Sequence, residues 1–327
     1  MRYIARRLVF YLVAFWSGIT LNFFLPRMLP GNPFDAFEVR FSGQLLSNPH
    51  LLDSLRAEFD TGHGSILSQY WQYLVNLSHL DFGISYSQYP TPVNTIIGTA
   101  LPYTLLLAGL STLLAFLIGT MLGILVAWRR GSVMDVVCTP FSMFLQSFPP
   151  FFIGLLILYW FGVDLGWFPI SRAYDDTVSP GWGLAFVLNL ADHCVMPLAA
   201  LLLSSVGGWM FGMRNVMINI LTDDYILMAE AKGLKPRRIM MMYAARNALL
   251  PQVTSFAITL GYAITSLILV EWIFGYPGLG FTLVNAVVSE DYTMMQALFF
   301  IIVVGMLLAN LIADLLYARL DPRARSM

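Results

Sequence analysis

The sequence is poor in charged side chains. Only 11% of its 327 residues are Asp, Glu, Lys or Arg, whereas soluble domains carry roughly a quarter. Hydrophobic residues make up 58% of the chain, and the mean hydropathy is +0.70. This balance argues against an ordinary soluble domain. No surface of interleaved basic and aromatic residues supports a nucleic-acid partner.

Cysteines and catalytic motifs are also scarce. The two cysteines, Cys138 and Cys194, fall in apolar stretches that we place near opposite membrane faces, so we expect no disulfide. The sequence has no G-x-x-x-x-G-K-[ST] loop for ATP, no H-E-x-x-H zinc motif and no G-x-S-x-G nucleophile motif. We therefore expect no catalytic residue, cofactor or metal site in this chain.

Long uncharged runs are what the sequence has instead. A bilayer core needs roughly 20 apolar residues in a helix, and lipid requires the backbone to satisfy its own hydrogen bonds. Six runs without Lys, Arg, Asp or Glu meet this need or come close. We predict an all-α membrane protein with six transmembrane helices, at Leu8–Leu25, Leu101–Trp128, Val136–Val163, His193–Met213, Asn247–Val270 and Tyr292–Ala313.

The charges favour one orientation. With both termini cytoplasmic, the inner segments hold all but Arg27, Arg40, Arg56 and Arg172 of the 18 basic residues, as the positive-inside rule requires. Most of the 19 acidic residues then lie outside. The basic inner loops are thus a signal of topology.

The loops divide the chain into four parts. Residues 1–29 form the cytoplasmic N-terminus and first span, 30–95 an outer cap, 96–318 the main membrane domain and 319–327 a cytoplasmic tail. In the cap, "ILSQYWQYLVNL" has helical spacing and aromatic residues that suit a membrane interface. The membrane domain includes a long inner loop at 219–250.

A few polar or helix-breaking residues interrupt the spans. Pro149-Pro150 must bend or break the third span, and Gln146, Ser204 and Ser205 accompany it as candidates to line a pathway. The alternative is that these side chains serve packing between helices. Among acidic residues, only Asp314 is predicted to approach a span, so no ion-coupling site is evident. The chain is then either a passive pore or a pump driven by a partner.

The inner loop contains a short helix with an exposed apolar side. Thr222, Asp223 and Asp224 favour a helix start, Gly233 favours a left-handed stop, and Pro236 favours the start of a second helix. Tyr225, Leu227, Met228 and Ala231 can share one side. We expect this side to dock in a groove of a partner protein; the alternative is a helix lying on the inner leaflet.

The segment "AEAKGLKPRRIMMMYAARNALLPQVT" resembles the cytoplasmic coupling loop of binding-protein-dependent ABC transporter permeases, especially the dipeptide and oligopeptide class. "LPGNP", "DFGISYSQYPTPVNTIIGTALPYTLLL", "SFPPFFIGLLI", "EWIFGYPGLG" and "DLLYARLDPRAR" resemble the same class in the same order. Glu230 departs from it, standing where a basic residue is usual.

This resemblance implies a bacterial inner-membrane importer subunit. Its expected partners are a second permease, two ABC ATPase subunits that bind ATP and Mg, and an extracytoplasmic substrate-binding protein. The residues expected to contact the ATPase are Asp224, Tyr225, Met228, Ala229, Glu230, Ala231, Lys232, Gly233 and Leu234. Peptides are the expected cargo; oligosaccharides, nickel chelates and glutathione-like solutes are alternatives within the class. Outside this class of importers, a passive channel and a membrane-embedded enzyme are the alternative functions.

Overall fold

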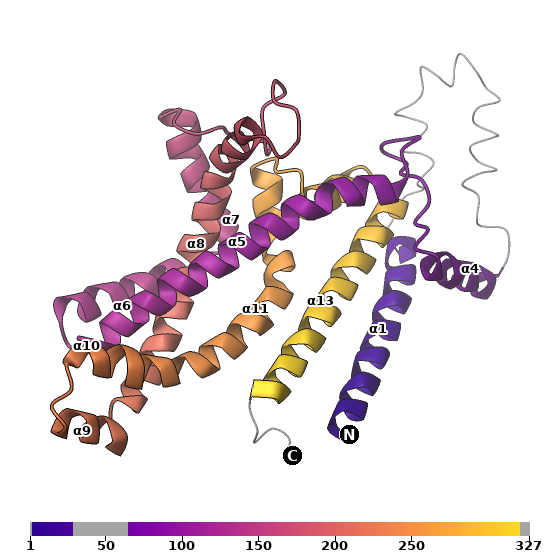
Figure 1. Ribbon diagram of the computed structural model, residues 1–327. Coiled ribbons are helices and arrows are strands. Elements are labelled where there is room, and N and C mark those ends of the chain that lie inside the picture. Colours follow the sequence, from indigo (N-terminus) through magenta and orange to yellow (C-terminus); the bar gives the residue numbers. More distant parts are fainter. Residues whose placement is uncertain (1, 29–64, 321–327) are drawn as a thin grey trace. The chain divides into compact units, whose positions relative to one another are not determined.

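The structure, a computed structural model, describes residues 2–28 and 65–320 (Figure 1). Within these residues it is built from helices, and an isolated bridge joins Ile84 to Pro92. The predicted all-helical class is confirmed. The elements are α1 (Arg2–Met28), α4 (Ile66–Ser78), α5 (Val93–Trp128), α6 (Val133–Gln146), α7 (Pro150–Ile157), η1 (Leu158–Asp164), α8 (Leu184–Ile220), α9 (Asp224–Ala231), α10 (Pro236–Arg238), η2 (Ile239–Ala245), α11 (Arg246–Ile273), α12 (Leu279–Val288) and α13 (Tyr292–Leu320).

The long apolar helices coincide with the predicted spans. Four stretches are long and apolar enough to cross a membrane, and a bent pair of helices makes a fifth if it counts as one span. The predicted first span falls on a shorter apolar stretch within α1, Val9–Leu25. A multi-pass helical protein is therefore confirmed, while the count of six stays a prediction. The four stretches are Val93–Trp128, Leu184–Ile220, Pro236–Ile273 and Tyr292–Ile312.

The third predicted span is broken. Pro149 has extended backbone angles (φ −57°, ψ 143°) and precedes Pro150, the first residue of α7. A residue before proline is driven out of the helical region, and proline itself suits the first helical position. As a result α6 and the α7–η1 segment meet at a bend of 98°. The interruption was predicted, but its size was not, and the segment consists of two separate helices.

The chain divides into two compact units: Met1–Pro102 with Thr282–Gly305, and Tyr103–Phe281 with Met306–Met327. Residues 29–64 of the predicted cap and the tail after residue 320 lie outside the described residues. The four-part division made from the sequence stays a prediction.

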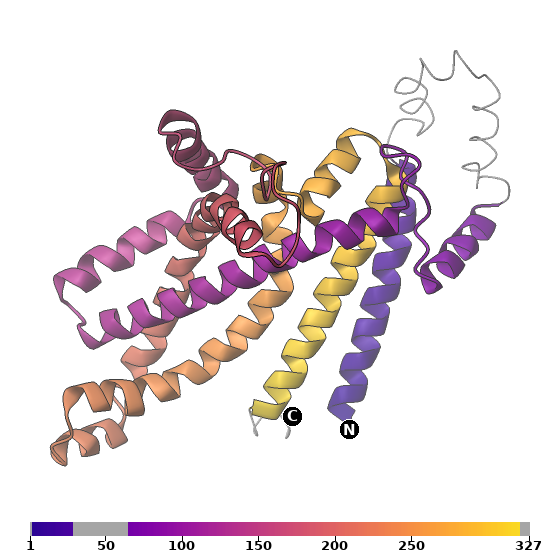
Figure 2. The same ribbon diagram turned by 45° about the horizontal axis from the view of Figure 1, so that its top comes forward.

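In the first unit, α1 packs beside the N-terminal half of α13 (Figure 2). A side chain built at Gly18 would lie 3.0 Å from Val303, and the Asn22 amide donates to the Gln296 carbonyl at 2.8 Å. At the start of α13, the buried Asp291 carboxylate accepts hydrogen bonds from Ser85 and from the Ser87 backbone. Asp291 therefore ties the segment before α5 to the start of α13.

In the second unit, glycines bring helices into close contact with α8. A Cβ atom at Gly119 of α5 would lie 2.5 Å from that of Trp209, and one at Gly123 would lie 2.5 Å from the Met210 carbonyl oxygen. Gly207 of α8 meets the backbone of α6 at Ser142 just as closely. Small residues allow such approaches between membrane helices. Gly207 therefore serves close packing between α8 and α6.

A partly buried ion pair strengthens the α6–α8 contact. Arg214 of α8 donates from Nε and Nη2 to the two oxygens of Asp135, at 2.8 and 3.0 Å. The same carboxylate accepts hydrogen bonds from the Gly131 backbone and the Thr139 hydroxyl. Two parallel bonds fix the geometry as well as the charge. The pair therefore holds the short turn between α5 and α6 against α8.

We predict that Gly123→Ala lowers the thermal midpoint of the purified chain in detergent. The added methyl group would overlap the Met210 carbonyl, and overpacking of this kind costs about 1–3 kcal/mol. Gly109→Ala, in the same helix, is the matched control because nothing lies within 4 Å of its Cβ position. Equal midpoints for the two variants would contradict the proposed close contact between α5 and α8.

Candidate functional site

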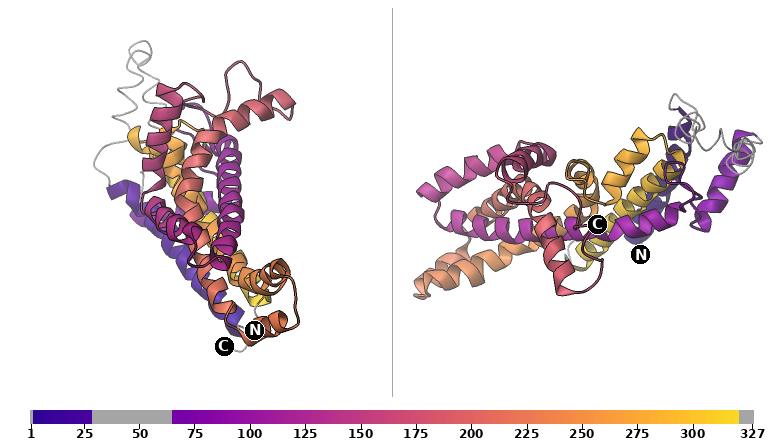
Figure 3. Two further views of the ribbon diagram at one scale, coloured as in Figure 1. Left: turned by 90° about the vertical axis from the view of Figure 1, so that its left-hand side faces the viewer. Right: turned by 90° about the horizontal axis from the view of Figure 1, so that it is seen from above.

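The predicted coupling loop folds as a compact helical hairpin. The helix α9 follows α8 after a short turn, and α10 begins the rod that continues through η2 into α11. The views of Figure 3 show α9 and this rod beside each other at one end of the second unit. The predicted continuation of the second helix into the fifth span is confirmed by the apolar helical stretch Pro236–Ile273.

The end of α9 has the predicted glycine stop. Gly233 is left-handed, with φ +73°. Its amide donates to the Glu230 carbonyl at 2.8 Å, and the Leu234 amide donates to the Ala229 carbonyl at 3.3 Å. These two bonds form a Schellman motif, which closes a helix and reverses the chain. Pro236 then opens α10 at its first turn, as the sequence predicted.

One side of α9 is fixed in a hydrophobic core. Ile226 and Ala229 are buried in a cluster whose other members come from the ends of α5 and α8, from η2 and from the start of α11, with Leu234 packed against it. Ala229, one of the expected ATPase contacts, therefore faces inward. Because α9 shares a core with the membrane helices, a force applied to α9 reaches those helices directly.

The other side of α9 is exposed and apolar. Leu227 and Met228 are 57% and 61% exposed, and Tyr225 is 38% exposed. The Tyr225 hydroxyl accepts a hydrogen bond from the Asn247 amide of α11 at 2.9 Å, which holds the ring in place. Ala231 is exposed beside them. The apolar side predicted from the sequence is thus presented outward.

Exposed charges surround this apolar side. Acidic residues stand at the start of α9, where they complement the helix dipole, and basic residues follow its end. The other expected contacts, Asp224, Glu230, Lys232 and Gly233, are all exposed, and Leu234 is half-buried. The hairpin therefore offers an apolar centre with a polar rim, which is the usual anatomy of a protein interface.

The pathway candidates lie near the bend and on the facing part of α8. The Gln146 amide group lies close to Gly208, since a Cβ built there would be 3.0 Å from Nε2. Ser205, one helical turn away, is exposed, whereas Ser204 is buried and donates to the Leu201 carbonyl. The structure thus separates the two serines, and the pathway role of this group stays a prediction.

Sequence reasoning missed a buried carboxylate. Glu271 lies within α11 and is fully buried, so the expectation that only Asp314 approaches a span is wrong. Its oxygens accept hydrogen bonds from the Thr104 hydroxyl at 2.7 Å and the Gly280 amide at 2.6 Å. A signal was present: the glycines of "EWIFGYPGLG", since a side chain at Gly278 would overlap the carboxylate. Glu271 caps the start of α12 from a distance.

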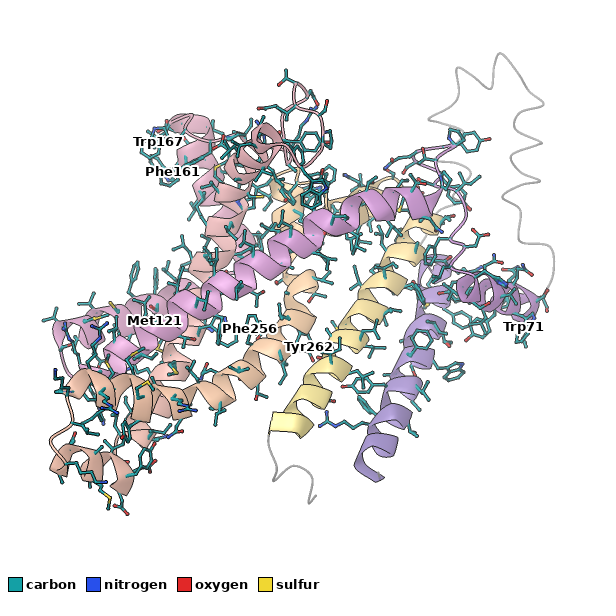
Figure 4. All side chains as sticks on the ribbon, in the orientation of Figure 1. Trp71, Met121, Phe161, Trp167, Phe256 and Tyr262 are labelled. Atoms are coloured by element: carbon teal, nitrogen blue, oxygen red, sulfur yellow. The ribbon has the colours of Figure 1, made fainter. Side chains whose placement is uncertain are left out.

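Aromatic side chains also join three helices of this unit. The ring of Phe116 in α5 lies 4.8 Å from that of Phe256 in α11 and 5.3 Å from that of Trp209 in α8, centroid to centroid. Figure 4 labels Phe256 on α11. With the glycine contacts, this group links α5, α8 and α11.

Comparison with known proteins connects this architecture to one family. The family model described as "Binding-protein-dependent transport system inner membrane component" matches residues 119–326. This range contains the bent helix pair, α8, the α9 hairpin and α11. The chain belongs to this family. It is thus an inner-membrane permease component, and the resemblance seen in the sequence is confirmed.

Curated relatives extend the similarity over the whole chain. The oligopeptide transport system permease protein AppB of Bacillus subtilis is 34% identical over 310 residues, which are 94% of each chain. The oligopeptide transport system permease protein OppB of Haemophilus influenzae is 31% identical over 99% of each chain. A solved structure of the inward-facing MetNI methionine ABC transporter is 16% identical, with a TM-score of 0.55. It covers 69% of this chain and 96% of its own, and it supports the fold.

We predict that Glu271→Gln destabilises the chain. An amide presents one acceptor where the carboxylate uses both oxygens, and leaving a buried donor unpaired costs about 1–3 kcal/mol. The thermal midpoint should fall, and amide exchange at Gly280 and Phe281 should accelerate. Glu230→Gln makes the same change at an exposed position and should leave both unchanged. Equal stability for the two variants would show that Glu271 does not cap α12.

We predict that Gly233→Val loosens the end of α9. A β-branched residue in the left-handed region costs roughly 1–2 kcal/mol. The hydrogen-exchange rates of the backbone amides at positions 233 and 234 should therefore increase in this variant. Gly233→Asn, which tolerates this conformation better, should have a smaller effect. If valine and asparagine gave the same exchange rates as glycine, the left-handed stop would be wrong.

Proposed function

We propose that this chain is a transmembrane permease subunit of an ATP-driven importer of peptides. The relatives are named as oligopeptide and di- or tripeptide transport permeases, which supports peptides as the cargo. The single observation that carries the mechanism is the two-sided arrangement of α9. Its inner side lies in the core formed with α5, α8 and α11, while its outer side presents Leu227 and Met228 to a partner.

The partner of α9 is an ABC ATPase subunit in this proposal. Leu227 and Met228 insert into a groove of the ATPase, and the charged rim sets the register of docking. Burying each of these side chains supplies about 1.5–3 kcal/mol. The ATPase binds ATP and Mg, and this chain supplies the surface on which the ATPase acts.

Motion of the ATPase then reaches the membrane helices through the packing around α9. When two ATPase subunits close on ATP, they displace α9, and α9 carries with it the ends of α5, α8 and α11, which share its core. Close-packed interiors move as bodies because they are hard to compress. Movement of these helix ends opens the pathway alternately to either side of the membrane.

The complete pathway requires a second permease subunit. This chain contributes one half, with Gln146, Pro149, Pro150, Ser204 and Ser205 beside the 98° bend as its candidate lining. A substrate-binding protein delivers cargo at the extracytoplasmic face. The distribution of basic residues supports cytoplasmic termini in the bacterial inner membrane, which places α9 on the side where ATP is available.

We predict that Met228→Glu and Leu227→Glu each weaken binding of the ATPase subunits at least about tenfold, since a lost apolar anchor costs about 1.5–3 kcal/mol. The measurement is co-purification of the ATPase with the permease in mild detergent, followed by ATP-dependent peptide uptake in proteoliposomes. Both residues are exposed, so the variants should fold normally.

Trp182→Glu provides the control for this experiment. It places the same acidic side chain at a fully exposed apolar residue in the 165–183 segment, which the topology puts on the opposite side of the membrane. ATPase binding by this variant should match the unmodified chain. Full ATPase binding and uptake by Met228→Glu and Leu227→Glu would overturn the docking surface.

A further inference from the structure

The helix α4 has an unusual surface for a segment outside the membrane spans. Its 13 residues, "ILSQYWQYLVNLS", include no charged side chain. Leu67 and Trp71 are 81% and 68% exposed, and Ile66 at its start is 62% exposed. Ser68 and Gln72 are exposed on an adjoining side. With about 3.6 residues per turn, Leu67, Trp71 and Val75 form one apolar line and Ser68, Gln72 and Asn76 a polar one.

A third side of α4 is fixed to α1. The Tyr70 hydroxyl shares a hydrogen bond of 2.7 Å with the Thr20 hydroxyl, and the Asn22 amide donates to the Tyr73 hydroxyl at 3.1 Å. The ring of Phe23 lies 5.2 Å from that of Tyr70 and 5.5 Å from that of Tyr73. These contacts, all inside the first unit, set the position of α4 along α1.

The contacts place α4 at the end of an apolar stretch. Thr20 and Phe23 lie in the last two turns of Val9–Leu25, and Arg27 follows one turn later. Arg27 turns back, donating to the Phe23 carbonyl at 2.7 Å and covering its ring. Arginine at a helix end keeps its charge at the membrane surface. At 1.5 Å per residue, α4 meets α1 within about 10 Å of that level.

The part of α1 that α4 contacts also has exposed apolar residues. Beside the α4 contact, α1 exposes Leu21, Phe24 and Leu25 at 68%, 42% and 46%. In a membrane component with such helices, these residues lie against acyl chains. Trp71 (Figure 4) is the residue type that gathers at the headgroup level.

We propose that α4 is an interfacial helix, embedded in the headgroup region of the leaflet opposite the N-terminus. Leu67, Trp71 and Ile66 contact lipid, Ser68 and Gln72 face water, and Tyr70 and Tyr73 hold α1. Its separate apolar and polar sides suit a helix that lies along a membrane, with uncharged Ser and Gln residues in place of the usual basic ones. The position of α4 favours lipid as the occupant of this side, because its contacts lie at the end of the apolar stretch Val9–Leu25, one to two turns from Arg27. The helix thus anchors the end of the first span and fixes its depth.

Spin-label accessibility tests this inference. In a chain lacking Cys138 and Cys194, single variants Leu67→Cys and Trp71→Cys carry a nitroxide, and Ser68→Cys and Gln72→Cys are the matched controls one position away. The full chain is placed in vesicles of phosphatidylethanolamine and phosphatidylglycerol. Collision rates are measured with oxygen, which concentrates in lipid, and with a water-soluble nickel chelate.

The expected result is that neighbouring positions prefer opposite collision reagents. Labels at 67 and 71 should favour oxygen over the nickel chelate, and labels at 68 and 72 should favour the chelate. If nickel accessibility at 67 and 71 is as high as at 68 and 72, both sides of the helix lie in water, and the proposal is overturned. Low accessibility to both reagents at 67 and 71 would show that protein covers this side, and it would overturn the proposal equally.

Discussion

The close approach of helices to α8 is the constraint on which the second unit depends. In lipid, apolar side chains gain little by leaving their surroundings, so helices associate through van der Waals contact and polar bonds. Gly119 and Gly123 bring α5 against α8, and Gly207 brings α6 against its other side. The Asp135–Arg214 pair adds a charged contact at the end of the same interface. Because a short turn joins the end of α8 to α9, the position of the candidate coupling helix follows from these contacts.

Local chemistry in the sequence was enough to predict the helices and the hairpin. Long uncharged runs identified the apolar helices, and the order Asp, Gly, Pro identified where α9 begins and ends and where α10 begins. These signals work because caps and spans depend on neighbouring residues. The left-handed Gly233 and the apolar side that includes Leu227 and Met228 could therefore be predicted without a structure.

The features that sequence reasoning missed depend on residues far apart in the chain. Thr104 and Glu271 are separated by 167 positions, and no local pattern joins them. Gly119 and Gly123 are visible in the sequence as small residues, but no local pattern names α8 as the helix they contact. The prolines at 149 and 150 predicted a break, whereas its 98° angle is set by the packing of both helices against α8. The inward direction of Ala229 likewise depends on the core around it.

The Asp135–Arg214 pair has a consequence for how the protein is made. The two residues are 79 positions apart, and translation proceeds at roughly 5–20 residues per second. For several seconds the Asp135 carboxylate of a nascent α6 therefore lacks Arg214, its partner on α8. Until α8 is made, the partners available to this carboxylate are those of its own segment, the Gly131 amide and the Thr139 hydroxyl. The ion pair thus imposes an order on biogenesis: α6 settles into its final place with α8 rather than before it.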